Sequence, residues 1–193
     1  MFDWFNFIIY MLATTMTPGP NNIMSMSNAS RVGLKKAMPF NCGVFTGFTI
    51  VTILCMIFCN YLAEVLPIIK TPMLFIGAGY MLYLAWKTVK RTNQIEEKEA
   101  SISYKMGVVL QFVNPKLYIF SIVSMEVYVL PYYQGNWPAL LGFSVIMASA
   151  GSFANLVWAM GGSMLKKLFS EHAKIVNTVM ALLLIYCAVS LFR

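Results

Sequence analysis

Two proline-containing turns stand where apolar helices would otherwise be continuous. The first is Thr17-Pro18-Gly19-Pro20-Asn21-Asn22, and the second is Asn114-Pro115-Lys116. Because proline lacks an N–H group and its ring clashes with the carbonyl four residues back, neither turn continues an α-helix. In hydrocarbon, such a break is tolerated only where it is buried in protein or lines a wet cavity. Paired breaks in the two halves of a membrane chain therefore predict a substrate site between them.

The prolines free backbone carbonyl groups that could bind a cation. Each proline leaves the carbonyl four residues before it without its helical donor. The three carbonyls freed in this way belong to Thr14, Met16 and Gln111. Freed carbonyls at the end of a half-helix form the negative end of its dipole. We expect these three groups to face the ammonium group of a ligand.

A new half-helix is expected to begin beyond each break. Thr17-Pro18 and Asn114-Pro115 both match a start signal, with a capping residue followed by proline at the first helical position. Free N–H groups at those starts, near Asn21, Asn22 and Lys116, favour a carboxylate. Cation-binding and anion-binding ends placed side by side predict a zwitterion, and an α-amino acid is the simplest one.

Three further polar residues bear on this site. Lys116 is the one unambiguous charge expected at membrane depth, about ten residues or roughly 15 Å from the surface. At that distance a functional role is favoured over snorkelling, either binding a carboxylate or exchanging a proton. Glu126 is expected near the outer surface, and no Asp or Glu is expected near the midplane of any span. Asn155 either packs between helices or faces the cavity.

The composition indicates a membrane protein. The 193 residues are 59% hydrophobic and 11% charged, with a mean hydropathy of +0.70. A soluble domain of this length does not need that much apolar surface. The net charge of +7 comes from Lys and Arg gathered in short loops, which favours the positive-inside rule over nucleic-acid binding. Since Met1-Phe2-Asp3 contains no basic residue, no cleaved signal peptide is expected.

Six segments have the length and apolar character of membrane spans. They are Trp4–Ser27, Pro39–Leu62, Thr71–Trp86, Met106–Leu130, Pro138–Gly161 and Ile175–Phe192. The first, third and fifth loops between them contain nearly all the Lys and Arg residues, so these loops are predicted to be cytoplasmic. Both termini are then periplasmic.

The chain is expected to form one all-α transmembrane domain, residues 1–193, built from two repeats of three helices. Repeat 1 covers about residues 1–90 and repeat 2 about residues 101–193, joined by a cytoplasmic hinge loop at about 87–105. Because three is an odd number, the second repeat must have the opposite orientation in the membrane. Helices 1 and 4 open the two repeats and contain the two breaks, as an inverted repeat requires.

The remaining motifs leave two alternatives open. Gly43 and Gly47 form a GxxxG pair, which predicts a helix contact within the chain or between two copies in a homodimer. Cys55 and Cys59 share one face of the second segment, and a membrane thiol-redox carrier is the alternative function. All four cysteines, Cys42, Cys55, Cys59 and Cys187, lie in apolar segments typical of reduced packing residues. No catalytic constellation, metal site or cofactor is predicted.

Several stretches together resemble the LysE/RhtB family of amino-acid exporters. They are Thr17–Ile23, Ala78–Tyr80, Leu84–Lys87, Phe112–Lys116, Gly151–Asn155, Trp158–Ala159 and Leu182–Val189. The resemblance covers nearly the whole chain, and its length and number of spans agree. It assigns Pro18, Gly19, Pro20, Asn21 and Asn22 to one membrane break, and Asn114, Pro115 and Lys116 to the other.

The resemblance implies a multi-pass carrier of the bacterial inner membrane, surrounded by lipid. It implies export of small neutral amino acids, with cysteine and O-acetylserine first among them, by alternating access and proton antiport. The missing midplane carboxylate leaves the residue that carries the coupling proton open.

Overall fold

The computed structural model describes residues 2–90, 103–164 and 173–190, and every regular element within them is helical. The elements are α1 (Trp4–Met16), α2 (Pro20–Val32), α3 (Leu34–Ile57), α4 (Cys59–Lys90), α5 (Tyr104–Phe112), α6 (Pro115–Val123), the π-helix η2 (Ser124–Val129), α7 (Leu130–Tyr133), α8 (Trp137–Met164) and α10 (Ala173–Ser190). The expected all-α fold class is confirmed.

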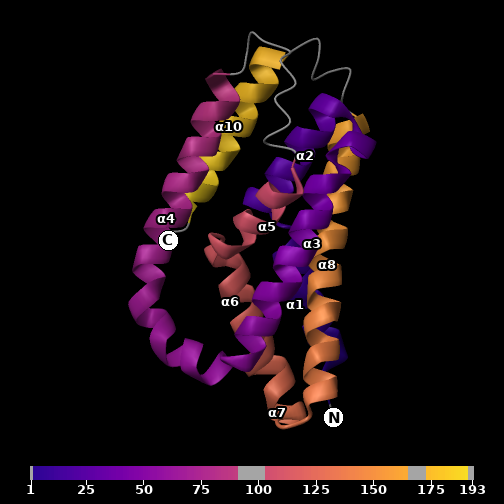
Figure 1. Cartoon of the computed structure of the whole chain (residues 1–193), viewed down its shortest axis with the longest axis vertical. Coiled ribbons are helices and arrows are strands. Elements are labelled where there is room, and N and C mark those ends of the chain that lie inside the picture. Colours follow the sequence, from indigo (N-terminus) through magenta and orange to yellow (C-terminus); the bar gives the residue numbers. More distant parts are fainter. Residues whose placement is uncertain (1, 91–102, 165–172, 191–193) are drawn as a thin grey trace.

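The helices pack as a bundle with a two-helix layer beside it (Figure 1). In the bundle, α3 packs against α5 and α8, and α2 packs against α8 and α3. The layer consists of α4 and α10, which lie along one another and touch the bundle through α6 and α2. The two broken helices, α1–α2 and α5–α6, contact each other through hydrogen bonds between Asn21 and Gln111 and between Lys116 and Thr17.

Helix α2 is polar in sequence yet buried. Ten of its thirteen residues are buried, among them three asparagines and three serines. Its polar groups bond within the protein, as where Ser25 Oγ donates to Asn41 Oδ1 at 2.9 Å. A helix of this composition avoids lipid because unsatisfied polar groups are costly there. The surrounding helices, chiefly α8 and α3, pack around α2 and separate it from lipid.

Glycines allow α3 and α5 to approach closely. A Cβ added to Gly43 would collide with the Tyr104 carbonyl oxygen, and one added to Gly107 would collide with the Phe40 carbonyl oxygen. A Cβ on Gly47 would lie 2.8 Å from the Val108 carbonyl oxygen. The Gly43–Gly47 pair thus makes a helix contact within the chain, one of the two alternatives left open by its sequence.

Several described helices are apolar enough for a membrane. Length and composition qualify α3 and α8 as spans, and α5 with residues Pro115–Tyr133, bent by 63°, forms either a broken span or a re-entrant loop. Shorter apolar helices are Trp4–Met16, Leu74–Trp86 and Asn177–Val189. The arrangement as six spans stays a prediction.

Two expected boundaries were wrong. Helix α3 begins at Leu34, five residues before the expected Pro39, and contains this proline in its second turn. Helix α4 is continuous from Cys59 to Lys90, so the loop expected between the second and third segments is helical. Most of the expected hinge, residues 91–102, lies outside the described residues.

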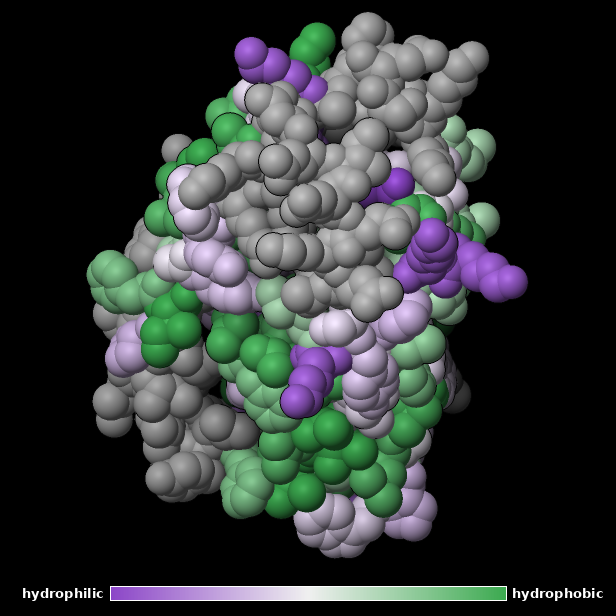
Figure 2. Space-filling model, turned by 45° about the horizontal axis from the view of Figure 1, so that its top comes forward, coloured by the Kyte–Doolittle hydropathy of each residue, from purple (hydrophilic) through white to green (hydrophobic). Residues whose placement is uncertain are grey.

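Basic and apolar side chains are separated along the molecule. Exposed Arg31 lies in the last turn of α2, Lys35 and Lys36 in the first turn of α3, and Lys105 in the first turn of α5. Figure 1 shows the start of α3 at the end of the bundle opposite the N-terminus. Figure 2 shows apolar side chains over the lower half of one face and most strongly hydrophilic ones above them. Lys166 and Lys167 of the expected fifth loop lie outside the described residues. This distribution is typical of a protein that spans a membrane with its basic loops on one side.

Candidate functional site

The first break separates α1 from α2. Helix α1 ends at Met16, and α2 begins with Pro20 at its first position and Gly19 as N-cap. The sequence placed this start at Pro18. The reason for the difference is Pro20, which disfavours the α conformation at the residue before it. Gly19 is accordingly extended, with φ −164° and ψ 171°.

The second break separates α5 from α6 and agrees with the prediction. Helix α5 ends at Phe112, and α6 begins with Pro115 at its first position and Asn114 as N-cap. The Asn114 side chain makes no capping hydrogen bond. Its Oδ1 atom is buried and has no hydrogen-bond partner. This oxygen is therefore available to a ligand.

The two breaks contact each other through the residue that follows each helix-opening proline. Asn21, after Pro20, exchanges two hydrogen bonds with Gln111, at 2.7 and 3.1 Å. Lys116, after Pro115, donates from Nζ to the Thr17 hydroxyl at 2.7 Å and to the Thr17 carbonyl at 3.1 Å. The start of α2 thus contacts the end of α5, and the start of α6 contacts the end of α1.

The three carbonyls expected to be free already have donors. The Thr14 carbonyl accepts from the Thr17 hydroxyl at 2.7 Å, and the Met16 carbonyl accepts from the Trp158 indole N–H at 3.2 Å. The Gln111 carbonyl accepts from the Asn114 N–H at 3.3 Å. Side chains and the turn itself thus replace the lost helical donors, and whether these carbonyls also face an ammonium group stays a prediction.

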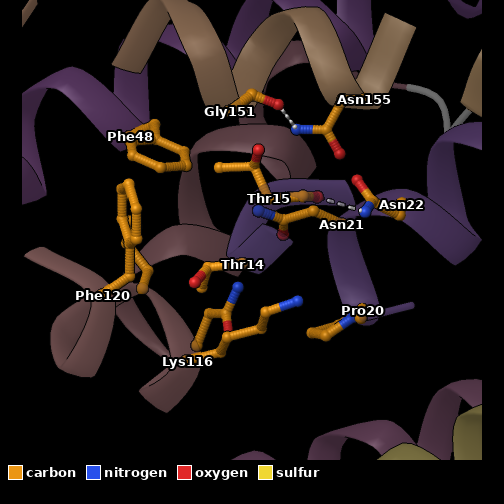
Figure 3. Close-up of a pocket in the computed structure, with 13 residues that line it drawn as sticks. Thr14, Thr15, Pro20, Asn21, Asn22, Phe48, Lys116, Phe120, Gly151 and Asn155 are labelled. Carbon is orange, nitrogen blue, oxygen red and sulfur yellow. Dashed lines mark hydrogen bonds between the residues drawn. The ribbon is translucent and has the colours of Figure 1, made fainter. Parts of the chain in front are cut away.

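A cavity of about 40 Å³ lies where the breaks meet (Figure 3). Of the residues chosen from sequence, those that line it are Thr14, Gly19, Pro20, Asn21, Asn22, Asn114, Lys116 and Asn155. The others, Met16, Thr17, Pro18, Gln111 and Pro115, belong to the same breaks but do not line it. The structure therefore brings Asn155, from a distant helix, to both breaks.

Five lining residues were missed from sequence, namely Thr15, Phe48, Leu117, Phe120 and Gly151. Gly151 carried a signal, since it stands four residues before Asn155 and so shares its helix face. Thr15 and Leu117 adjoin residues that were chosen. Phe48 and Phe120 carried no signal, because a cavity-facing phenylalanine in a span resembles a lipid-facing one.

One end of the cavity is positive. The backbone N–H groups of Asn21 and Asn22 precede the first hydrogen bond of α2, which joins Ile23 N to Gly19 O at 3.0 Å. The N-terminal end of this 13-residue helix has a partial positive charge. The Lys116 ammonium adds a full charge, and it lies so close that a Cβ on Gly19 would be 3.3 Å from Nζ. This end suits a carboxylate.

Amide oxygens occupy another part of the cavity. Asn22 Nδ2 donates to the carbonyls of Thr15 at 2.8 Å and Thr17 at 2.9 Å. Asn155 Nδ2 donates to the Gly151 carbonyl at 3.0 Å. These bonds fix both amides so that each oxygen faces away from the carbonyls that accept from its amide nitrogen. Asn155 Oδ1 is buried and without a hydrogen-bond partner.

The third part of the cavity is apolar. The rings of Phe48 and Phe120 pack edge to face, with centroids 5.9 Å apart and planes at 77°. Gly151 faces Phe48 so closely that an added Cβ would collide with the ring. Tyr10 stacks on the other side of Phe120, with centroids 5.9 Å apart. Contacts with Gly151 and Tyr10 therefore hold the Phe48 and Phe120 rings in place.

The expected thiol pair is differently placed. Cys55 and Cys59 are buried free cysteines, but α3 ends at Ile57 between them, so they do not share one intact helix. Glu126 is exposed on η2 and does not line the cavity. Within the described residues, no group of three or more His, Cys, Asp or Glu is placed to hold a metal ion.

Comparison with known proteins identifies the family. The chain is 37% identical over 188 residues to cysteine/O-acetylserine efflux proteins of Escherichia coli strain K12 and Shigella sonnei strain Ss046, covering 96% of this chain and 95% of each relative. No solved structure matches. The family model for the LysE type translocator matches residues 12–193. Since that family consists of translocators, the chain is a membrane transporter and not an enzyme. It belongs to the LysE family of translocators.

Proposed function

We propose that this protein exports small neutral amino acids across the bacterial inner membrane, with cysteine and O-acetylserine as its substrates. The observation that carries the proposal is the meeting of two proline-broken helices at one cavity that Lys116 lines. Broken helices supply free backbone groups at membrane depth, which is how transporters bind charged substrates. The names of its relatives supply the two substrates.

The chemistry of the cavity supports a zwitterion. Helix N–H groups and the Lys116 ammonium attract a carboxylate, whereas unpartnered amide oxygens accept from an ammonium. The apolar rings of Phe48 and Phe120 adjoin both. An α-amino acid with a small side chain presents these three groups on one carbon.

The packing supports two inverted repeats, residues 1–90 and 101–193, that rock against each other. Helix α3 packs on α8 and α4 on α10, pairs that a two-fold axis exchanges. Helix α4 also touches α6 as α10 touches α2, which are equivalent contacts under the same axis. The same axis also exchanges the contact of Asn21 with Gln111 and the contact of Lys116 with Thr17. Rocking would expose the cavity to each side in turn.

The cavity volume supports alternating access. About 40 Å³ is room for a few water molecules, so a whole amino acid requires the lining side chains to move apart. Lys116 is the single ionisable residue among those that line the cavity. Proton antiport would therefore act through the Lys116 ammonium. The basic loops would face the cytoplasm and the termini the periplasm.

The test is uptake of labelled amino acids into proteoliposomes under an imposed pH gradient. The set contains cysteine, O-acetylserine, threonine, homoserine and lysine, and a protonophore collapses the gradient in the control. We expect accumulation of cysteine and O-acetylserine that disappears with the gradient. If the labelled substrate only equilibrates across the membrane and never accumulates, the result would contradict antiport and indicate a passive pathway. No uptake by folded, inserted protein would overturn the proposed function.

A further inference from the structure

We propose that the substrate's ammonium group binds to the side-chain amide oxygens of Asn22, Asn155 and Asn114, and that its carboxylate binds between Lys116 and the start of α2. This inference rests on the proposed function and deepens it, because it fixes the direction in which an amino acid lies. It also makes the three asparagines the groups that select an α-amino acid over an acid without an amine.

The first step is that two of these three oxygens are buried without donors. Asn114 and Asn155 are only 4% and 2% exposed, and Oδ1 of each has no hydrogen-bond partner. A buried acceptor without a donor costs free energy, so such groups in native proteins usually await a ligand or water. Both side chains line the cavity, one from the second break and one from α8.

The second step is the orientation of the amides. Asn22 Nδ2 bonds to two backbone carbonyls and Asn155 Nδ2 bonds to one, which determines where each oxygen lies. Figure 3 shows the oxygens of Asn22 and Asn155 pointing toward one another. Two facing acceptors need a donor between them. An ammonium group has three N–H donors and matches three amide oxygens.

The third step excludes the opposite direction. Lys116 Nζ uses two of its three hydrogens on Thr17 and keeps one for a ligand. The backbone N–H groups of Asn21 and Asn22 are also unused. An ammonium placed here would meet a like charge and the positive end of a helix, whereas a carboxylate is attracted by both.

The experiment uses ligands that differ by one group. Cysteine contains both charged groups, 3-mercaptopropionate lacks the ammonium, and cysteamine lacks the carboxylate. Binding of each to the purified full-length protein in nanodiscs under reducing conditions is measured from the ligand-induced rise in melting temperature. The variants are Asn155→Leu and Asn155→Asp. Ser144→Ala is the control on α8, because Ser144 is buried, bonds to the Leu140 carbonyl and does not line the cavity.

Asn155→Leu is expected to weaken cysteine binding by about tenfold or more, as expected for a lost hydrogen bond to a charged group. Binding of 3-mercaptopropionate should stay unchanged. Asn155→Asp should tighten cysteamine and weaken 3-mercaptopropionate, because it places a negative charge at the ammonium position. Ser144→Ala should bind all three ligands as the wild type does.

The outcomes separate the two proposals. If the wild type binds cysteine but Asn155→Leu weakens cysteine and 3-mercaptopropionate alike, the subsite assignment is overturned and the exporter function stands. Unchanged cysteine binding by Asn155→Leu would also overturn it, and would mean that the oxygens hold water only. If the wild type binds no amino acid in this assay and transports none, the proposed function fails and the inference fails with it.

Discussion

Lys116 Nζ lies 2.7 Å from the Thr17 hydroxyl oxygen and joins two membrane breaks that are 99 residues apart in sequence. The ammonium is half-buried at the C-terminal end of α1, where the helix dipole is negative. The same group lies beside the positive start of α2. Lys116 is thus held at the C-terminal end of α1, and it faces the ligand site at the start of α2.

Lys116→Ala should reduce export of cysteine and O-acetylserine at least tenfold, because it removes the one full positive charge of the cavity. Lys116→Arg keeps the charge and should retain more transport than Lys116→Ala. The measurement is efflux from cells that express equal amounts of each variant, with folding checked by size-exclusion chromatography. Export near the wild-type rate by Lys116→Ala would remove this residue from the mechanism.

Gly19→Ala tests the close approach of the backbone to Lys116. An added Cβ would lie 3.3 Å from Lys116 Nζ, tighter than an ordinary contact. Since the extended backbone of Gly19 is open to any residue, alanine should displace the ammonium by a few tenths of an ångström without unfolding the protein. We expect transport to fall severalfold at an unchanged melting temperature. Gly142→Ala is the matched control, because nothing lies within 4 Å of its added Cβ.

Gly107→Ala should destabilise the protein rather than alter its chemistry. Its Cβ would collide with the Phe40 carbonyl oxygen and lie 2.8 Å from Val44 N, and neither backbone can move aside. Overpacking of this kind costs about 1–3 kcal/mol. A melting curve in detergent should show the loss, while Gly142→Ala should melt at or above the wild-type temperature. An unchanged melting temperature for Gly107→Ala would contradict the α3–α5 contact.

The breaks and their meeting could be predicted from the sequence because proline acts locally. Pro20 and Pro115 each lack the N–H that would continue the preceding helix, and each stands at the first position of the next one. Lys116 and Asn155 were also accessible, since polar groups at membrane depth are rare.

The donors that occupy the freed carbonyls could not be predicted. Trp158 reaches Met16 from 142 residues away, and no local pattern encodes that contact. The continuous α4 was missed for the opposite reason. Glu64, Pro67 and Lys70 between the two apolar segments indicated a loop, whereas α4 remains helical through them.

Replacing all four cysteines by alanine should leave export largely intact. The reason is that Cys55, Cys59 and Cys187 are buried and outside any disulfide, and none of the four lines the cavity. Alanine is preferred to serine because a buried hydroxyl without a partner would add a separate cost. Efflux of O-acetylserine measures the result, since this substrate has no thiol. Loss of export from a folded cysteine-free variant would instead favour the thiol-redox carrier.

Phe48→Ala should widen the range of substrates. Phe48 and Phe120 form the apolar wall of the cavity, and Phe48 also fills the space over Gly151. Removing the ring creates room for a longer side chain, at a stability cost of about 3–5 kcal/mol. Competition with labelled cysteine in proteoliposomes should show methionine or leucine gaining at least tenfold in inhibition relative to the wild type. Phe153→Ala is the control, because Phe153 is an exposed phenylalanine of α8 that does not line the cavity. If Phe48→Ala folds and still discriminates against methionine and leucine as the wild type does, the substrate's side chain does not meet this wall.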